Sequence, residues 1–141
     1  MSKLARMHTA EHILSAVMKH HYDAPRNLEL HLGEKKTKCD YQVPKPLRED
    51  DIDQIERLVN NQIQKNHPAS AFFLNRHQAE DYDLWKVPED AEEIRIVRIG
   101  DFDAQPCSGE HVSNTGEIGT FRISSFEMKD SGRVRIRFKI D

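Results

Sequence analysis

A chain of 141 residues, with 37% hydrophobic and 32% charged residues, is long enough to fold as one domain with its own core. Its formal net charge of −3 excludes wholesale, non-specific binding to nucleic acid but is compatible with a local basic face. No apolar run approaches the roughly 18 residues of a membrane span, and the N-terminus lacks the apolar core of a signal peptide. With only Cys39 and Cys107 as cysteines, we expect a cytoplasmic protein with no membrane partner, whose thiols are free or bound to metal.

The predicted elements are helices interspersed with antiparallel strands. In chain order, the hydrophobic pattern predicts a helix at residues 4–22, two strands joined by a tight turn within 28–43, a helix at 49–66, a short buried strand at 69–74, a short helix at 76–85, a strand at 94–99 and a final antiparallel pair at 117–126 and 133–140. This order indicates the α+β class, with an antiparallel sheet packed against the long N-terminal helix and a second helix. Because no linker or repeat interrupts the chain, we expect a single domain over residues 1–141.

Two pairs of side chains that bind metals have the same spacing. His8 and His12 lie four residues apart in the first predicted helix, and therefore one turn apart on one face. Cys107 and His111 repeat the spacing in a segment whose internal glycine predicts a loop. Three imidazoles and one thiolate suit the borderline softness and tetrahedral preference of zinc, so we predict one Zn²⁺ per chain. The alternative is a partly buried helix face for the histidines and simple packing for the cysteine.

Glu11 precedes His12 in the order H-x-x-E-H, the inverzincin pattern in which a glutamate beside zinc handles protons. Zinc lowers the pKa of bound water towards ~7, and a nearby carboxylate can pass the proton to a leaving oxygen. Glu11 is therefore the candidate catalytic residue. The alternatives are a carboxylate that orients a histidine ligand and a solvated helix residue. Glu110 directly precedes His111, as Glu11 precedes His12.

The two histidine-containing boxes also carry a resemblance to a known family. The segment from Arg95 to Phe121 reads RIVRIGDFDAQPCSGEHVSNTGEIGTF. It resembles the C-x-G-T-H-V box and the following T-G-x-I-G of the editing domain of alanyl-tRNA synthetase and of its free-standing relatives, the AlaX proteins. Threonyl-tRNA synthetases carry a related domain. The first helix, with RMHTAEHIL, is similar to the H-x-x-x-H of the family, so the resemblance covers about residues 4–126.

The resemblance implies a single AlaX-like editing domain that binds mischarged tRNA and hydrolyses, in trans, the ester between the tRNA and a wrong amino acid. For alanine editing that substrate is Ser- or Gly-tRNA(Ala). The resemblance assigns the zinc to the four residues already identified, namely His8, His12, Cys107 and His111.

Two positions depart from the family pattern. Glu11 and Glu110 stand where alanine-editing members commonly have threonine. Two carboxylates there favour the ammonium group of an aminoacyl substrate. Thr9, Gly109 and Glu110 are accordingly the candidate substrate-binding residues.

Binding of tRNA requires contacts to phosphates, which basic side chains supply. One basic group is expected on the first hairpin and another on the last strand, where basic and apolar residues alternate. The candidates are Lys35, Lys36 and Lys38 on the hairpin and Arg133, Arg135, Arg137 and Lys139 on the strand. The alternative is an ordinary solvated strand face.

Three other functions are compatible with the sequence. The chain could edit a different aminoacyl-tRNA, such as Ser-tRNA(Thr). It could be a non-catalytic tRNA-binding module, because four protein ligands are typical of a closed structural zinc site. It could also be a metalloenzyme acting on a small molecule, since H-T-x-E-H resembles the motif of S-ribosylhomocysteine lyase, although the segment 107–121 does not. The other histidines are expected at the surface or at helix ends, and Cys39 is expected to pack in the sheet.

Overall fold

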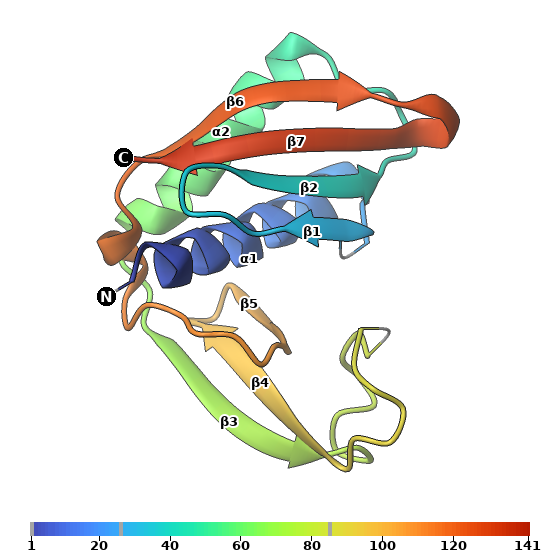
Figure 1. Ribbon diagram of the computed structural model, residues 1–141, viewed down its shortest axis with the longest axis vertical. Coiled ribbons are helices and arrows are strands. Elements are labelled where there is room, and N and C mark those ends of the chain that lie inside the picture. Colours follow the sequence, from blue (N-terminus) through green and yellow to red (C-terminus); the bar gives the residue numbers. More distant parts are fainter. Residues whose placement is uncertain (1, 26, 85) are drawn as a thin grey trace.

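The computed structural model describes residues 2–25, 27–84 and 86–141, and within them it has the predicted α+β fold (Figure 1). In chain order the elements are the helix α1 (Lys3–Tyr22), the strands β1 (Glu29–His31) and β2 (Thr37–Gln42), the helix α2 (Glu49–Gln64), the strands β3 (Ala69–Asn75), β4 (Glu93–Ile99) and β5 (Asp103–Pro106), the 3-10 helix η1 (Thr115–Ile118), the strand β6 (Phe121–Met128), the 3-10 turn η2 (Asp130–Gly132) and the strand β7 (Arg133–Ile140).

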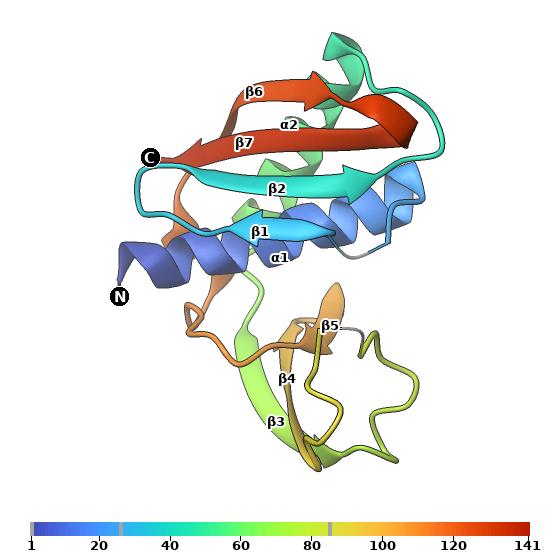
Figure 2. The same cartoon turned by 45° about the vertical axis from the view of Figure 1, so that its right-hand side comes forward.

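The helix α1 lies between two sheets, as both orientations in Figures 1 and 2 show. The Ser2 side chain begins the helix by accepting a hydrogen bond from the backbone N–H of Ala5 at 3.1 Å. Asp23, with φ 53°, ends it in the left-handed conformation. Because elements cover α1 on several sides, all residues from Thr9 to Met18 are buried, polar ones included. Polar side chains inside this stretch must therefore find partners within the protein.

The larger sheet has the strand order β1-β2-β7-β6, and every neighbouring pair is antiparallel. Alternate residues of β2 and β7 point towards α1 and α2 and form the main core with them, as the alternating pattern of the last strand predicts. The fully buried residues of this core include Met7, Ile13, Leu14, Tyr41, Ile55, Val59, Val134, Ile136 and Phe138.

The smaller sheet has the order β3-β4-β5 and a core of its own, formed by Ala79, Ile94 and Ile96. The predicted antiparallel sheet packed against two helices is thus present, and the structure adds a second, smaller antiparallel sheet. The sequence pattern does not predict β5, because its four residues, Asp103–Pro106, carry no alternating hydrophobic pattern. The pattern predicts a buried β3, but its residues are partly buried or exposed, since one face of this small sheet borders a cavity.

Residues 76–84 form turns and not the predicted short helix, and Trp85, the last residue of that prediction, lies outside the described residues. The side chain and backbone of Gln78 bond to Asn75, and the Arg76 guanidinium bonds to the carbonyls of Pro88 and Ala91. Such local side-chain bonds compete with helical hydrogen bonds, and a segment of this length gains little from helix formation alone.

The strand β6 begins later than predicted, whereas β7 has the predicted bounds. Residues 117 and 118 belong to η1, and β6 begins after Gly119, whose φ of 89° suits glycine. The second helix ends at Gln64 because Asn66 adopts a positive φ of 53°. The predicted antiparallel pairing of β6 with β7 is confirmed, and the turn at residues 130–132 joins the two strands.

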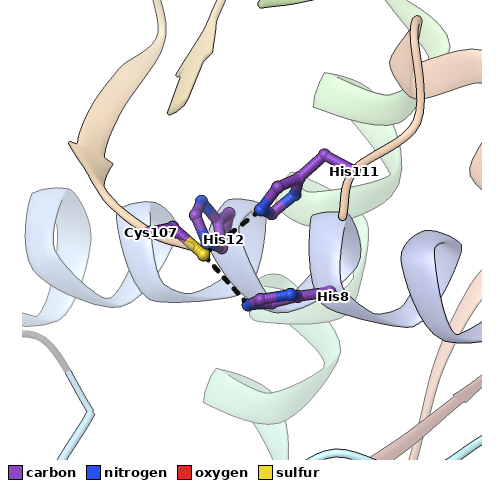
Figure 3. A group of neighbouring side chains, drawn as sticks. All are labelled: His8, His12, Cys107 and His111. Atoms are coloured by element: carbon purple, nitrogen blue, oxygen red, sulfur yellow. Dashed lines mark hydrogen bonds between the residues drawn. The ribbon is translucent and has the colours of Figure 1, made fainter. Parts of the chain in front are cut away.

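The loop between β5 and η1 brings Cys107 and His111 beside the helix α1 (Figure 3). At its far end, Thr115 is buried and its hydroxyl donates to the carbonyl of Ile63, at the end of α2. The Arg6 guanidinium of α1 donates to the carbonyls of Ile118 and Asp141, at 2.8 and 2.9 Å. These contacts fix the loop against the helix that carries His8 and His12.

Candidate metal centre

The structure brings the four predicted metal ligands together. His8 and His12 extend from α1, and Cys107 and His111 extend from the loop that follows β5 (Figure 3). Their potential ligand atoms all lie within 4.8 Å of one another. Within the described part of the chain, no other set of at least three His, Cys, Asp or Glu side chains has this arrangement.

The two distances from Cys107 Sγ fit a tetrahedral ion. Cys107 Sγ lies 3.4 Å from His8 Nε2 and 3.4 Å from His111 Nε2. Zinc bonds of about 2.0–2.1 Å to nitrogen and about 2.3 Å to sulfur place tetrahedral ligand atoms roughly 3.3–3.6 Å apart. The donor types and these two distances therefore suit zinc.

Thr9 sets the orientation of the His111 ring. Its hydroxyl donates to the carbonyl of Ala5 at 2.9 Å, so its oxygen is left to accept hydrogen bonds from Val112 N–H and from His111 Nδ1, each at 3.1 Å. The Nδ1 atom consequently carries the ring proton, and Nε2 presents its lone pair towards Cys107 Sγ. A histidine that ligates a metal is oriented in this way by a partner on its other nitrogen.

The environment of His111 keeps its ring neutral. Burial first, and then the charges of His8 and Arg95, lower the pKa of His111 to about 3. A neutral imidazole is the form that can ligate a metal.

Arg95 of β4 holds the loop that carries the cysteine. Its Nη1 donates to the carbonyl of Cys107 at 3.0 Å and to that of Gly109 at 2.8 Å. The backbone N–H of Gly109 points to Cys107 Sγ at 3.4 Å, and a Cβ at this position would collide with the ring of His8. The glycine is thus required for the close approach of loop and helix.

Glu11 lies beside the four side chains but inside the protein, with 1% of its surface exposed. Its Oε2 accepts hydrogen bonds from the Ser15 hydroxyl at 2.6 Å and from Asn27 Nδ2 at 2.8 Å. Its Oε1 lies 3.9 Å from His8 Nε2. The predicted catalytic role requires a carboxylate near solvent or substrate, whereas these contacts favour the alternative in which Glu11 orients the ligands.

The contacts of Glu11 continue into a buried polar network that the sequence did not reveal. The Ser15 hydroxyl also bonds to the Tyr41 hydroxyl at 2.7 Å, and Lys86 Nζ donates to Asn27 Oδ1. Cys39 packs beside the network, as predicted; burial, and then the charge of Glu11, raise the pKa of its thiol well above the ordinary value. Cys39 is therefore a neutral packing residue and lies outside the four-residue group.

A cavity of about 570 Å³ opens at one side of the metal group. His8, Cys107 and Gly109 form part of its wall. The remaining lining residues are Leu30, Phe73, Lys86, Val87, Pro88, Ala91, Glu93, Ile94, Arg95, Pro106 and Ser108. His8 and Cys107, two of the predicted metal ligands, therefore face a space that is large enough to hold a small molecule.

A second, more apolar cavity of about 320 Å³ also reaches His8 and Gly109, and Glu110 lines it together with Leu4 and Leu32. Two of the three predicted substrate-binding residues, Gly109 and Glu110, therefore lie where a ligand beside His8 could touch them. Thr9 does not line either cavity; it is fully buried and supports His111.

The three arginines of the last strand face carboxylates. Arg135 donates to both oxygens of the fully buried Asp40, and Arg133 donates to one of them at 2.7 Å. Although burial raises the pKa of Asp40, the hydrogen bonds from Arg135 and Arg133 outweigh this effect and hold the pKa below its ordinary value. Arg137 lies 3.8 Å from Glu127. The predicted tRNA-binding face of β7 is therefore partly neutralised within the protein.

Lys35 and Lys36 are both exposed in the loop between β1 and β2. The structure shows no helix within its described residues that is long and apolar enough to cross a membrane.

Comparison with known proteins relates the chain to aminoacyl-tRNA synthetases. The family described as the threonyl and alanyl tRNA synthetase second additional domain matches residues 94–137, a region that includes Cys107 and His111. The alanine–tRNA ligase of Petrotoga mobilis is 39% identical over 132 residues, or 92% of this chain. Those of Methanopyrus kandleri and Ignicoccus hospitalis are 33% and 31% identical, each over 96% of the chain. The chain spans 15 to 16% of the length of these relatives.

Proposed function

Because the chain belongs to the family of the threonyl and alanyl tRNA synthetase second additional domain, we propose that it binds mischarged tRNA and hydrolyses the ester between the tRNA and a wrong amino acid. The proposed cofactor is one zinc ion per chain, held by the four side chains of the metal group, His8, His12, Cys107 and His111. We propose Ser- or Gly-tRNA(Ala) as the substrate, with hydrolysis in trans.

One observation carries this proposal: two members of a four-donor metal group, His8 and Cys107, line a cavity of about 570 Å³. A purely structural zinc site needs no such opening. When bound, zinc polarises a carbonyl oxygen and lowers the pKa of water, which are the two requirements of ester hydrolysis.

The chain's own residues supply the positioning. Arg95 fixes the loop of Cys107, and Thr9 fixes His111. Glu11 lies within 3.9 Å of His8, and its carboxylate is held by Ser15 and Asn27. A group fixed in this way does not reorganise during the reaction, which is how positioning residues lower a barrier.

The aminoacyl end of the substrate is assigned to the second cavity. Glu110 is exposed there, close to His8 and Gly109, and its carboxylate can attract the ammonium group that every aminoacyl ester carries. The apolar walls formed by Leu4 and Leu32 favour a small side chain with little charge.

The same four donors favour a second candidate function, a non-catalytic tRNA-binding module. Four protein ligands complete a tetrahedron around zinc, as in structural sites, whereas catalytic sites usually keep one position open. In that case the protein would bind tRNA and zinc but would leave the ester intact.

Single-turnover deacylation tests the proposal. The zinc-loaded chain is mixed with Ser-, Gly- and Ala-tRNA(Ala) and with Ser-tRNA(Thr), each labelled on the amino acid, and zinc is measured on the same sample. We expect release of serine or glycine well above the spontaneous rate, and retention of alanine. Release from Ser-tRNA(Thr) alone would reassign the substrate, and binding without release from any of the four would establish the non-catalytic module.

A further inference from the structure

Phe73 is the one aromatic among the large apolar side chains that are exposed in the described residues, with 60% of its surface accessible. It lies on β3 and lines the same cavity of about 570 Å³ as His8 and Cys107. An aromatic ring left in water loses the free energy that its burial would provide, and an exposed ring in a cavity often marks a contact with a ligand.

The strand register places Phe73 close to the metal group. Phe73 pairs directly with Arg95 of β4, so the two side chains project from the same face of the sheet. Arg95 in turn reaches the carbonyls of Cys107 and Gly109. Phe73 therefore neighbours the arginine that holds the Cys107 loop, and Phe73, Arg95 and Cys107 line the same cavity.

The charge and shape of the cavity favour a nucleotide. Lys86 and Arg95 contribute positive charge and Glu93 contributes one negative charge, while Val87 and Pro88 are apolar lining residues. A volume of about 570 Å³ lies in the range of small-ligand sites, about 300–1,000 Å³. Single-stranded nucleic acid is bound by this combination of basic groups and an aromatic ring on which a base stacks.

We propose that Phe73 stacks on the terminal base of the substrate tRNA and so positions the ester beside His8 and Cys107. This inference rests on the proposed function, and it gives Phe73 the role of a positioning residue. It also divides the substrate between the two cavities, with the nucleoside on the Phe73 side and the amino acid on the Glu110 side.

A double-mutant cycle between protein and substrate tests the stacking. Phe73→Ala and Phe73→Trp are compared with the unaltered chain on aminoacyl-tRNA that carries or lacks the terminal base. With the base present, Phe73→Ala should raise KM by about 5- to 150-fold, the range expected for loss of one base–aromatic stack, and should leave kcat nearly unchanged. Phe73→Trp should retain the affinity. With the base absent, all three proteins should have the same KM.

Leu28→Ala is the matched control, because Leu28 is also exposed but does not line the cavity. It should change neither KM nor kcat. Zinc content and the unfolding temperature should be equal in all variants, since an exposed side chain contributes little to folding. A Phe73→Ala variant whose KM rises equally with and without the base, or does not rise, would overturn the inference.

Binding of an uncharged oligonucleotide ending in CCA separates this inference from the proposed function. Phe73→Ala should weaken that binding even if the chain hydrolyses no ester, in which case the stacking stands and the hydrolase proposal fails. Hydrolysis that continues with unaltered KM in Phe73→Ala would instead overturn the stacking and leave the hydrolase proposal standing. A protein partner on this surface would leave oligonucleotide binding insensitive to Phe73 and would also overturn the inference.

Discussion

The Thr9 hydroxyl oxygen accepts a hydrogen bond from His111 Nδ1 at 3.1 Å, and this contact links the histidine box of α1 to the cysteine loop. The same hydroxyl accepts a hydrogen bond from Val112 N–H and donates one to the carbonyl of Ala5, so its hydrogen-bonding capacity is used within the protein. The contact makes His111 Nε2 the nitrogen that faces Cys107, which is the orientation that a shared metal ion requires.

Replacing Thr9 should therefore weaken metal binding without removing a ligand. Thr9→Ala leaves His111 Nδ1 without its acceptor, and we expect zinc affinity to fall by about 10- to 100-fold, the usual effect of removing a partner behind a ligand. Thr9→Ser is the matched control, because it keeps the hydroxyl. Competition with a chromophoric chelator measures both affinities; equal affinities for Ala and Ser variants would contradict the assigned role.

The purified chain should contain about one zinc ion. His12→Ala and Cys107→Ala should each lose the metal, whereas Cys39→Ala and His67→Ala should keep it, since neither belongs to the four-residue group. Removing zinc with a chelator should lower the unfolding temperature, because an ion that binds only the folded chain stabilises it. Elemental analysis and thermal unfolding check these expectations; protein purified without chelator that holds well under half an equivalent of metal would refute the site.

Glu11→Gln distinguishes orientation of ligands from proton transfer. If Glu11 orients His8 and its neighbours, as its burial and its contacts to Ser15 and Asn27 favour, the variant should lose zinc affinity and activity together. If it transfers protons, zinc and tRNA affinity should persist while deacylation slows by ~100-fold or more. Rate and zinc occupancy are measured on one sample. An unchanged rate at full occupancy would remove Glu11 from the mechanism.

Acid should destabilise the fold partly through Asp40. Its pKa is lowered in the folded state by Arg135 and Arg133, so the stability that it contributes is present above its unfolded-state pKa of about 3.9 and is lost as pH falls through the lower folded-state value. Denaturant unfolding between pH 7 and pH 2 should show this loss, and Asp40→Asn should flatten it. An equally steep acid dependence in Asp40→Asn would contradict the assignment.

We expect some basic residues to stabilise the fold and others to bind tRNA. Arg135→Glu should lower the unfolding temperature, because it sets a second carboxylate beside the buried Asp40. Lys35→Glu with Lys36→Glu should instead weaken tRNA binding and leave zinc content and unfolding temperature unchanged, since both lysines are exposed. Filter binding at several salt concentrations measures the effect; affinity indifferent to salt and to both lysine changes would exclude phosphate contacts there.

Features that depend on residues close together in the chain could be predicted from the sequence. Helical spacing predicts that His8 and His12 lie on one face of the first helix, and alternation predicts which side of the last strand is apolar. The structure confirms both predictions. The same local reasoning was wrong at residues 76–84, where bonds to Asn75 and to the carbonyls of Pro88 and Ala91 replaced helical ones.

Which polar groups meet solvent, and which meet one another, depends on the tertiary structure. The pattern of β7 predicts a basic face. In the structure, however, Arg133 and Arg135 donate hydrogen bonds to the buried carboxylate of Asp40 on the neighbouring strand. Likewise, the sequence pattern indicates a reactive Glu11 beside a metal, but α1 is enclosed between two sheets, and Ser15 and Asn27 reach the oxygens of Glu11. Burial and hydrogen bonding between segments distant in sequence depend on the packed chain as a whole, and no local pattern specifies them.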